Sequence, residues 1–182
     1  MRLAQLAFLV ATRTAAYAPL SRLRPRRVAR RASEDVNSSD AVDKDRLPRR
    51  PSPEALPEEV VAAQMVALAF GDVFRCFKFA SPSNKAVTGP WQRFERMLAD
   101  NPEYSPMLRC VHWKFIGGLP LDDPDKRIVR VRVYPEKDEN SPPAPPMVDY
   151  EFQLSRQPDY PEDDARRPVA NCWVTDGVVA VR

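Results

Sequence analysis

The apolar faces of the extended segments in this sequence contain few residues that could move a proton. The only histidine, His112, alternates with Trp113 in an extended pattern, so it shares a face with Lys114 and not with the tryptophan. Tyr150 is the one residue with an acidic proton on the apolar face of its segment. Without an Asp or His on that face, general acid–base catalysis lacks its reacting groups. We expect a structural place for His112 on a sheet surface and a core position for Tyr150, bonded through its hydroxyl. A catalytic role for either is the alternative.

The cysteines do not form a recognisable site either. Cys76, Cys110 and Cys172 are far apart and make no Cys-x-x-Cys pair, so neither a zinc site nor a thioredoxin-type site is indicated. We expect buried free thiols; the alternative is a light-responsive disulfide, which needs alpha carbons within about 4.4 to 6.8 Å of each other. Five glycines in the whole chain exclude a glycine-rich phosphate cradle. We expect no metal and no cofactor.

A polar segment, Phe-Ala-Ser-Pro-Ser-Asn at residues 79–84, separates two apolar stretches. We interpret it as a loop that Ser81 and Asn84 order through bonds from side chain to backbone, with Thr88 helping the turn into Pro90. The alternative is that Ser81 and Asn84 bind a ligand at the mouth of a pocket.

Charge divides the chain of 182 residues. Residues 1–33 carry eight arginines and no acidic residue, whereas the remainder holds 20 basic and 25 acidic residues. A nucleic-acid-binding protein would keep positive charge on its folded part to neutralise phosphates, so we expect no nucleic-acid partner. No stretch reaches the roughly 20 apolar residues of a membrane span, and we expect none.

Residues 1–33 have the composition of two targeting signals in series. A short apolar run at 3–11 and Thr14-Ala15-Ala16 are typical of a secretory signal, and the acid-free, arginine-rich tract after Tyr17 is typical of a transit peptide. This order resembles the bipartite presequences of algae with secondary plastids, which implies the plastid stroma; the alternative is a mitochondrial presequence. Residues 34–55 are charged and proline-containing, so we expect a disordered linker there and one folded domain at 56–182.

Helices open the predicted domain. Pro57 suits a first helical position, and residues 60–70 are almost wholly apolar, which predicts a helix buried on most sides. Gly71 and Asp72 permit a stop, although the helix could continue toward residue 79. A second helix is predicted from residue 91 to Asn101, and a short turn at 105–108.

Four strands follow, at about 111–115, 127–134, 146–155 and 169–175, and residues 178–181 either continue the last of them or pair back on it. Asp176 and Gly177 indicate either a tight hairpin or a bulge in the last of them. Helices followed by antiparallel strands predict an α+β fold with the helices packed on one face of the sheet. Residues 135–145 connect the middle strands as a stiff, proline-rich loop; a proline-helix docking motif at 141–146 (SPPAPP) is the alternative.

The two middle strands suggest their own register. If paired positions sum to 281, Arg130 lies opposite Glu151 and Arg132 opposite Asp149 on the outer face. The same register places Val131 against Tyr150 and Val133 against Val148 on the inner face, so the charge pattern and the apolar pattern agree.

Several short segments, together with the order of elements, carry a resemblance. They lie at residues 77–85 (FKFASPSNK), 88–90 (TGP), Phe94, Met97, 104–108 (YSPML) and 172–178 (CWVTDGV). On these residues the chain resembles an uncharacterised family of the nuclear transport factor 2-like, or cystatin-like, superfamily, of a type found in bacteria and in plastid-targeted proteins of plants and algae. The resemblance covers about residues 56–182 and implies a cone-shaped fold, in which a curved sheet of about four strands wraps a long helix and leaves a pocket at its open end. It implies no particular reaction.

The sequence thus predicts a plastid binding or assembly domain that catalyses nothing by itself. Its expected partner is an apolar small molecule or another protein, and a homodimer through the sheet is also expected. A lyase, isomerase or hydrolase using the same pocket is the alternative function. The predicted ligand-binding residues are Trp113, Tyr150, Trp173, Ser81 and Asn84.

Overall fold

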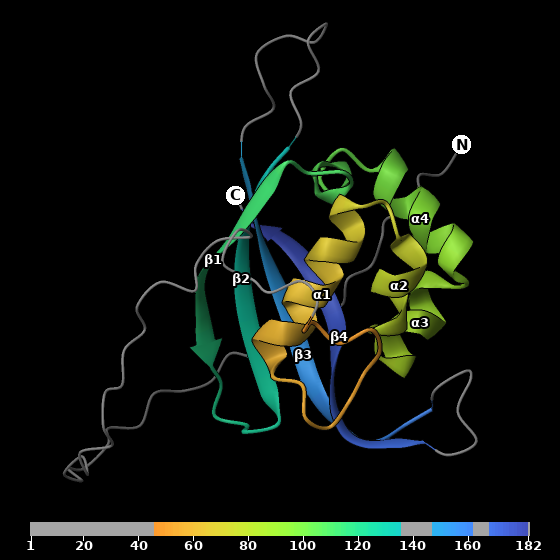
Figure 1. Ribbon diagram of the computed structural model, residues 1–182, viewed down its shortest axis with the longest axis vertical. Helices are drawn as coiled ribbons and strands as arrows, with labels where there is room; N and C mark the ends of the chain where they lie inside the picture. Colours follow the sequence, from red (N-terminus) through yellow and green to blue (C-terminus); the bar gives the residue numbers. More distant parts are fainter. Residues whose placement is uncertain (1–45, 136–146, 162–167, 182) are drawn as a thin grey trace, which may run out of the picture. The chain divides into compact units, whose positions relative to one another are not determined.

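The structure is a computed structural model, and it describes residues 46–135, 147–161 and 168–181 (Figure 1). The described residues all belong to one compact unit of the chain. The predicted targeting segment, the first part of the predicted linker and the proline-rich connection between the middle strands lie outside the described residues. No helix in the described part of the chain is long and apolar enough to cross a membrane.

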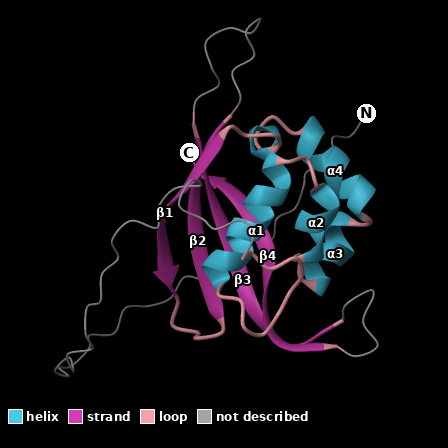
Figure 2. Cartoon of the chain, in the orientation of Figure 1, coloured by secondary structure: helices cyan, strands magenta, loops and turns pink. Residues whose placement is uncertain are grey.

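Helix α1, Pro57–Ala69, forms the centre of the domain, as predicted from its apolar sequence. Pro57 occupies the first turn, and the Glu59 carboxylate accepts a hydrogen bond of 2.8 Å from the backbone N–H of Leu56. Ten of its thirteen residues are buried, because it packs on the sheet on one side and meets the other helices on the other (Figure 2).

Three more helices form a second group beside α1. Helix α2, Val73–Lys78, is separate from α1 because Gly71 has a φ of 72° and the Asp72 side chain caps the new helix by accepting from Arg75 N–H. The predicted helix at 91–100 is confirmed as α4, Trp91–Asp100, and the predicted short turn as the 3-10 helix η1, Ser105–Met107. Helix α3, Pro82–Thr88, lies where a loop was expected.

The sheet is an antiparallel meander of four strands in the order β1-β2-β3-β4, and it does not close on itself. This confirms the α+β class and the four predicted strands. The first and third each extend five residues beyond their predicted ends, because residues that break the alternation there also pair. Their bounds are β1 His112–Pro120, β2 Lys126–Tyr134, β3 Val148–Tyr160 and β4 Val169–Val181.

The predicted register of the middle strands is confirmed. Arg130 pairs with Glu151, Arg132 with Asp149 and Val131 with Tyr150. Val131 and Tyr150 are both fully buried, so they share the face that α1 covers. Asp176 is the extra residue of a bulge, because the pairing of β3 with β4 shifts between Gln153 and Leu154, and β4 is a single long strand.

The folded domain begins before residue 56, which corrects the predicted linker boundary. Leu47 and Ala55 are 8% and 6% exposed and belong to the main core. The Pro48 carbonyl also accepts a hydrogen bond from Arg75. Residues 46–55 were expected to have almost nothing to bury, but two scattered apolar side chains are enough to hold this segment against the core.

Candidate functional site

Tyr150 lies deep in the core and serves it structurally. Its side chain is fully buried and its hydroxyl donates to the backbone carbonyl of Glu103 at 2.7 Å. Burial, with a smaller contribution from the neighbouring Tyr104, raises the pKa of the Tyr150 hydroxyl well above its ordinary value. A fully buried hydroxyl that donates to a backbone carbonyl is not placed to transfer its proton to a substrate, so the geometry favours the structural interpretation.

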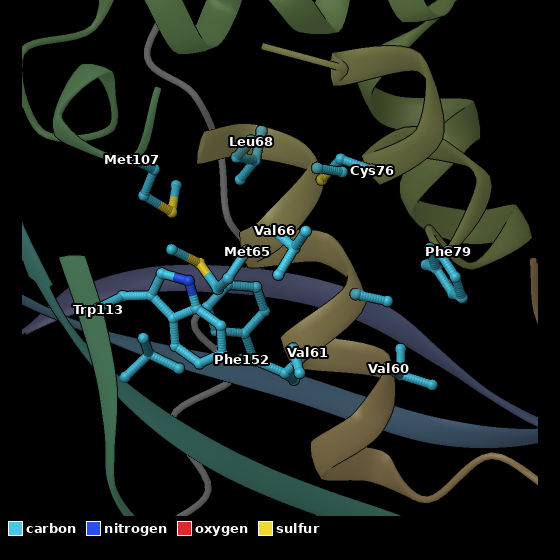
Figure 3. Close-up of a cluster of buried hydrophobic side chains, with 14 of the residues drawn as sticks. Val60, Val61, Met65, Val66, Leu68, Cys76, Phe79, Met107, Trp113 and Phe152 are labelled. Carbon is cyan, nitrogen blue, oxygen red and sulfur yellow. The ribbon is translucent and has the colours of Figure 1, made fainter. Parts of the chain in front are cut away.

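The two predicted pocket tryptophans are also core residues. Trp113 is 2% exposed and lies beside Met65 and Phe152 in the close-up of the core (Figure 3). Trp173 is 4% exposed, and the Arg156 guanidinium lies 4.9 Å from its ring centre. The structure therefore places Trp113, Tyr150 and Trp173 in the same core cluster, where their surfaces are already used by packing against neighbours.

Ser81 and Asn84 hold a helix and a strand together, and the expectation of a loop at 79–84 is wrong. Ser81 is the N-cap of α3, and its hydroxyl accepts from Asn84 N–H at 3.2 Å. The Asn84 amide donates to the Thr175 carbonyl at 3.2 Å, and Thr88 donates to the Asn84 carbonyl. The expected bonds from side chain to backbone are present, but Pro82 at the first helical position makes the segment a helix.

A buried polar group that the sequence analysis did not single out joins α1, α2 and β4. Thr175 donates to the Gln64 side-chain oxygen at 2.6 Å, and the Gln64 amide donates to the Cys76 carbonyl at 3.3 Å. Both Gln64 and Thr175 are at least 95% buried. Gln64 was the main polar interruption of an apolar helix, and that interruption was the available signal, since a buried amide needs partners.

Tyr160 was missed because it lies beyond the predicted end of its strand. Its ring is 1% exposed, and its hydroxyl lies within hydrogen-bond distance of the carbonyls of Lys78 and Ala80, at 2.7 and 2.9 Å. Lys85 places its amine 5.1 Å from the centre of the Tyr160 ring. The last residue of β3 is therefore hydrogen-bonded to the backbone between α2 and α3.

The three cysteines are buried free thiols in the structure, as expected. Burial raises the pKa of the Cys76 thiol to about 12 and that of Cys110 to about 11. A nucleophilic or metal-binding cysteine needs its thiolate, so neither Cys76 nor Cys110 is suited to that chemistry. Within residues 46–135, 147–161 and 168–181, no cluster of His, Cys, Asp and Glu could hold a metal ion.

His112 is half-buried at the start of the edge strand β1. It pairs with Tyr134, and the two ring centres are 5.2 Å apart. Trp113 points to the core, so His112 shares the opposite face of the sheet with Lys114, as the alternation predicted. This placement favours a structural role at the sheet surface.

The feature best suited to recognition lies on the helices. Phe74 of α2 meets Trp91 of α4 edge to face, with ring centres 5.7 Å apart, and Phe77 lies 5.5 Å from Phe94. We call these four residues the aromatic surface. Phe74 is 45% exposed and the other three are half-buried. The sequence predicts the helix that carries Trp91 and Phe94, but only the packing of α2 beside α4 shows that these rings meet Phe74 and Phe77.

Two lysines border the aromatic surface. The Lys78 amine lies 4.9 Å from the centre of the Phe74 ring, and the Lys85 amine lies 5.6 Å from that of Phe77. At these distances each ammonium group is attracted by a ring face. The aromatic surface therefore combines one exposed and three half-buried rings with two lysine amines at its border.

The fold and these sites define an α+β domain with an open antiparallel sheet and an aromatic, positively charged patch on its helices. Comparison with known proteins finds no family model, no curated protein and no solved structure that matches the chain.

Proposed function

We propose that this chain is a non-catalytic binding domain that recognises a protein partner through the aromatic surface. The observation that carries the proposal is the edge-to-face contact of Phe74, which is 45% exposed, with the half-buried Trp91 on the neighbouring helix. Aromatic residues are enriched in protein interfaces, where they supply large apolar area at low conformational cost. Their exposure on a helix pair costs solubility, and a partner would remove that cost.

The absence of catalysis is proposed because the buried polar side chains serve the fold. Tyr150 and Tyr160 both bond backbone carbonyls, and Gln64 and Thr175 bond each other. A general acid or base needs a proton-accepting partner and access to substrate. The arrangement of these groups supports structural roles.

The aromatic surface is a better candidate for the binding site than the concave face of the sheet. Trp113, Tyr150 and Trp173 were the expected pocket residues, and all three are packed into the core. Binding at the concave face would have to open this packing, whereas binding at Phe74 and Trp91 would not.

We also propose that the domain is a nuclear transport factor 2-like cone, because a long helix packs on a four-stranded meander. In that fold the sheet would also be the surface through which two copies form a homodimer.

We propose that the protein is located in the plastid stroma, because residues 1–33 are rich in arginine and contain no acidic residue.

A photo-crosslinking experiment tests the proposed function. The full chain carries benzoylphenylalanine at position 74 and is irradiated in lysate of the source organism. The matched control carries the same probe at Leu119, which is 46% exposed and lies on β1, away from the helices. We expect a discrete protein adduct at position 74 that disappears in the Trp91→Ala background. Equal labelling at both positions, or none at position 74, would refute the proposal.

The location has its own test. Residues 1–45 are fused to a fluorescent protein and expressed in an alga with a secondary plastid. Fluorescence in the plastid is the expected outcome, and fluorescence in mitochondria would establish the alternative.

A further inference from the structure

The segment that carries the aromatic surface contains basic residues and no acidic one, and this composition bears on what kind of partner fits it. From residue 73 to residue 94, which includes α2, α3 and the start of α4, the chain holds four basic residues and no Asp or Glu. The nearest acidic residues in sequence are Asp72, which caps α2, and Glu95. All four aromatic rings lie inside this acid-free segment.

The positive charges lie beside the rings and not merely near them in sequence. Lys78 and Lys85 each lie within 6 Å of a ring of the aromatic surface. Lys85 is held between two rings, those of Phe77 and Tyr160, which fixes its amine at the border. An ammonium group held in this way loses little side-chain entropy when an anion binds it.

Resting on the function proposed above, we propose that the partner of the aromatic surface is an acidic peptide segment with an aromatic or aliphatic anchor. The anchor side chain packs against Phe74 and Trp91, and carboxylates on either side of it pair with Lys78 and Lys85. Apolar contact supplies most of the affinity, while the charge pairs orient the segment and accelerate its association. A basic segment would meet like charge on both sides of its anchor.

Selection from a random dodecapeptide phage library tests this proposal with the full chain as bait. Because residues 1–33 carry eight arginines that also attract acidic peptides, the bait is compared with its Lys78→Glu/Lys85→Glu variant. Lys126→Glu, at a side chain that is 58% exposed on β2, is the matched control. Thermal melting of each variant checks that it is folded.

We expect the native chain and the Lys126→Glu control to select peptides in which Asp or Glu flanks Phe, Trp or Leu. The Lys78→Glu/Lys85→Glu variant should select Lys- and Arg-rich peptides instead. A synthetic acidic peptide from this selection should bind the double variant with about tenfold lower affinity than the native chain, which corresponds to about 1.4 kcal/mol. Its binding to the native chain should weaken as salt increases.

Other outcomes overturn the inference in distinguishable ways. In the first, peptides bind and Phe74→Ala abolishes their binding, but the peptides show no preference for acidic residues. The inference about an acidic partner then fails, while the proposed binding function stands.

In the second, no peptide depends on Phe74 for binding and the probe at position 74 gives no crosslink. The proposed function then fails as well. Acidic peptides that bind the double variant equally well would locate binding at the arginine-rich segment. Concentration-dependent dimers, or binding to phosphatidylglycerol vesicles, that Phe74→Ala abolishes would assign the aromatic surface to a second copy or to a membrane.

Discussion

Three tyrosine hydroxyls form hydrogen bonds to backbone carbonyls that are distant in sequence. Tyr104 donates to the Val178 carbonyl at 3.2 Å, and Tyr150 and Tyr160 bond the carbonyls of Glu103 and Lys78, each at 2.7 Å. Each bond joins a helix or its flank to the sheet. A phenol suits this use, because its ring fills the core while its hydroxyl satisfies a carbonyl that would otherwise be buried without a partner.

Replacing Tyr150 with Phe should lower the free energy of unfolding by about 1 kcal/mol, because the ring stays and only the hydrogen bond is lost. Chemical denaturation measures the change, with Tyr160→Phe, whose hydroxyl has two carbonyls in reach, as the comparison that should lose more. Peptide binding at the aromatic surface should not change in Tyr150→Phe. A loss of binding with unaltered stability would contradict the structural role.

The buried Cys76 thiol should make stability depend on pH in the alkaline range. Its pKa rises from 9.0 to about 12 on folding, so between these values the unfolded chain releases a proton that the folded chain keeps. Stability is therefore complete below about pH 9 and falls as the pH rises toward 12. We expect a smaller loss of stability between pH 8 and pH 10.5 in Cys76→Ala than in the native chain, measured by urea denaturation. Equal losses would show that the thiol titrates normally.

At the scale of elements, charge on the outer face of the sheet reinforces the strand register. The Arg132 guanidinium donates twice to the Asp149 carboxylate, at 2.7 and 2.8 Å, and Arg130 donates to Glu151 at 2.8 Å. The hydrogen bond from Arg132, together with its charge, lowers the pKa of the Asp149 carboxyl. Bidentate pairs of this kind are geometrically specific, so they disfavour a register shifted by one residue.

Exchanging the two charges tests this role. Arg132→Asp and Asp149→Arg should each lower the melting temperature, because each places like charges opposite one another. The double exchange should restore most of the loss. The Lys126–Asp123 pair, which is more exposed and 3.8 Å long, is the control and should show no coupling. If the double exchange is no more stable than the single variants, the pair does not contribute to pairing.

Helix α3 begins with a start signal that is present in the sequence. Ser81 followed by Pro82 is a capping residue followed by a favoured first helical position. Gly89, with a φ of 76°, ends α3 in a conformation that glycine adopts readily. The helix is only seven residues long, so its apolar period was too short to predict it.

At the scale of the whole molecule, the core extends beyond the helix and sheet that dominate it. Leu47 and Ala55 pack into the main cluster from a segment without regular structure. Arg75 of α2 also donates a hydrogen bond to the Pro48 carbonyl of this segment. The folded unit is therefore longer than its regular elements.

Leu47→Ala should destabilise the domain by about 2 kcal/mol, because it removes a buried side chain from the core. The matched control is Leu56→Ala, since Leu56 is 59% exposed and should tolerate truncation with little change. Thermal and urea unfolding of the full chain measure both variants. Equal stability of Leu47→Ala and the native chain would show that residues 46–55 are not part of the folded unit.

The sequence by itself determined the class of fold, the position of α1, the four strands and the register of β2 with β3. These follow from local periodicity and from charges that match across neighbouring strands, both of which are written in short stretches of chain. The same alternation correctly assigned Tyr150 to the buried face and His112 to the opposite one.

Only the tertiary structure decided what the polar and aromatic side chains do. The Tyr150 hydroxyl meets a carbonyl 47 residues away, and Thr175 meets Gln64 across 111 residues. The aromatic surface exists because α2 packs beside α4, which turns Phe74 and Trp91 outward together. No periodic pattern specifies such contacts, since they depend on how elements pack in space and not on the order of residues within each one.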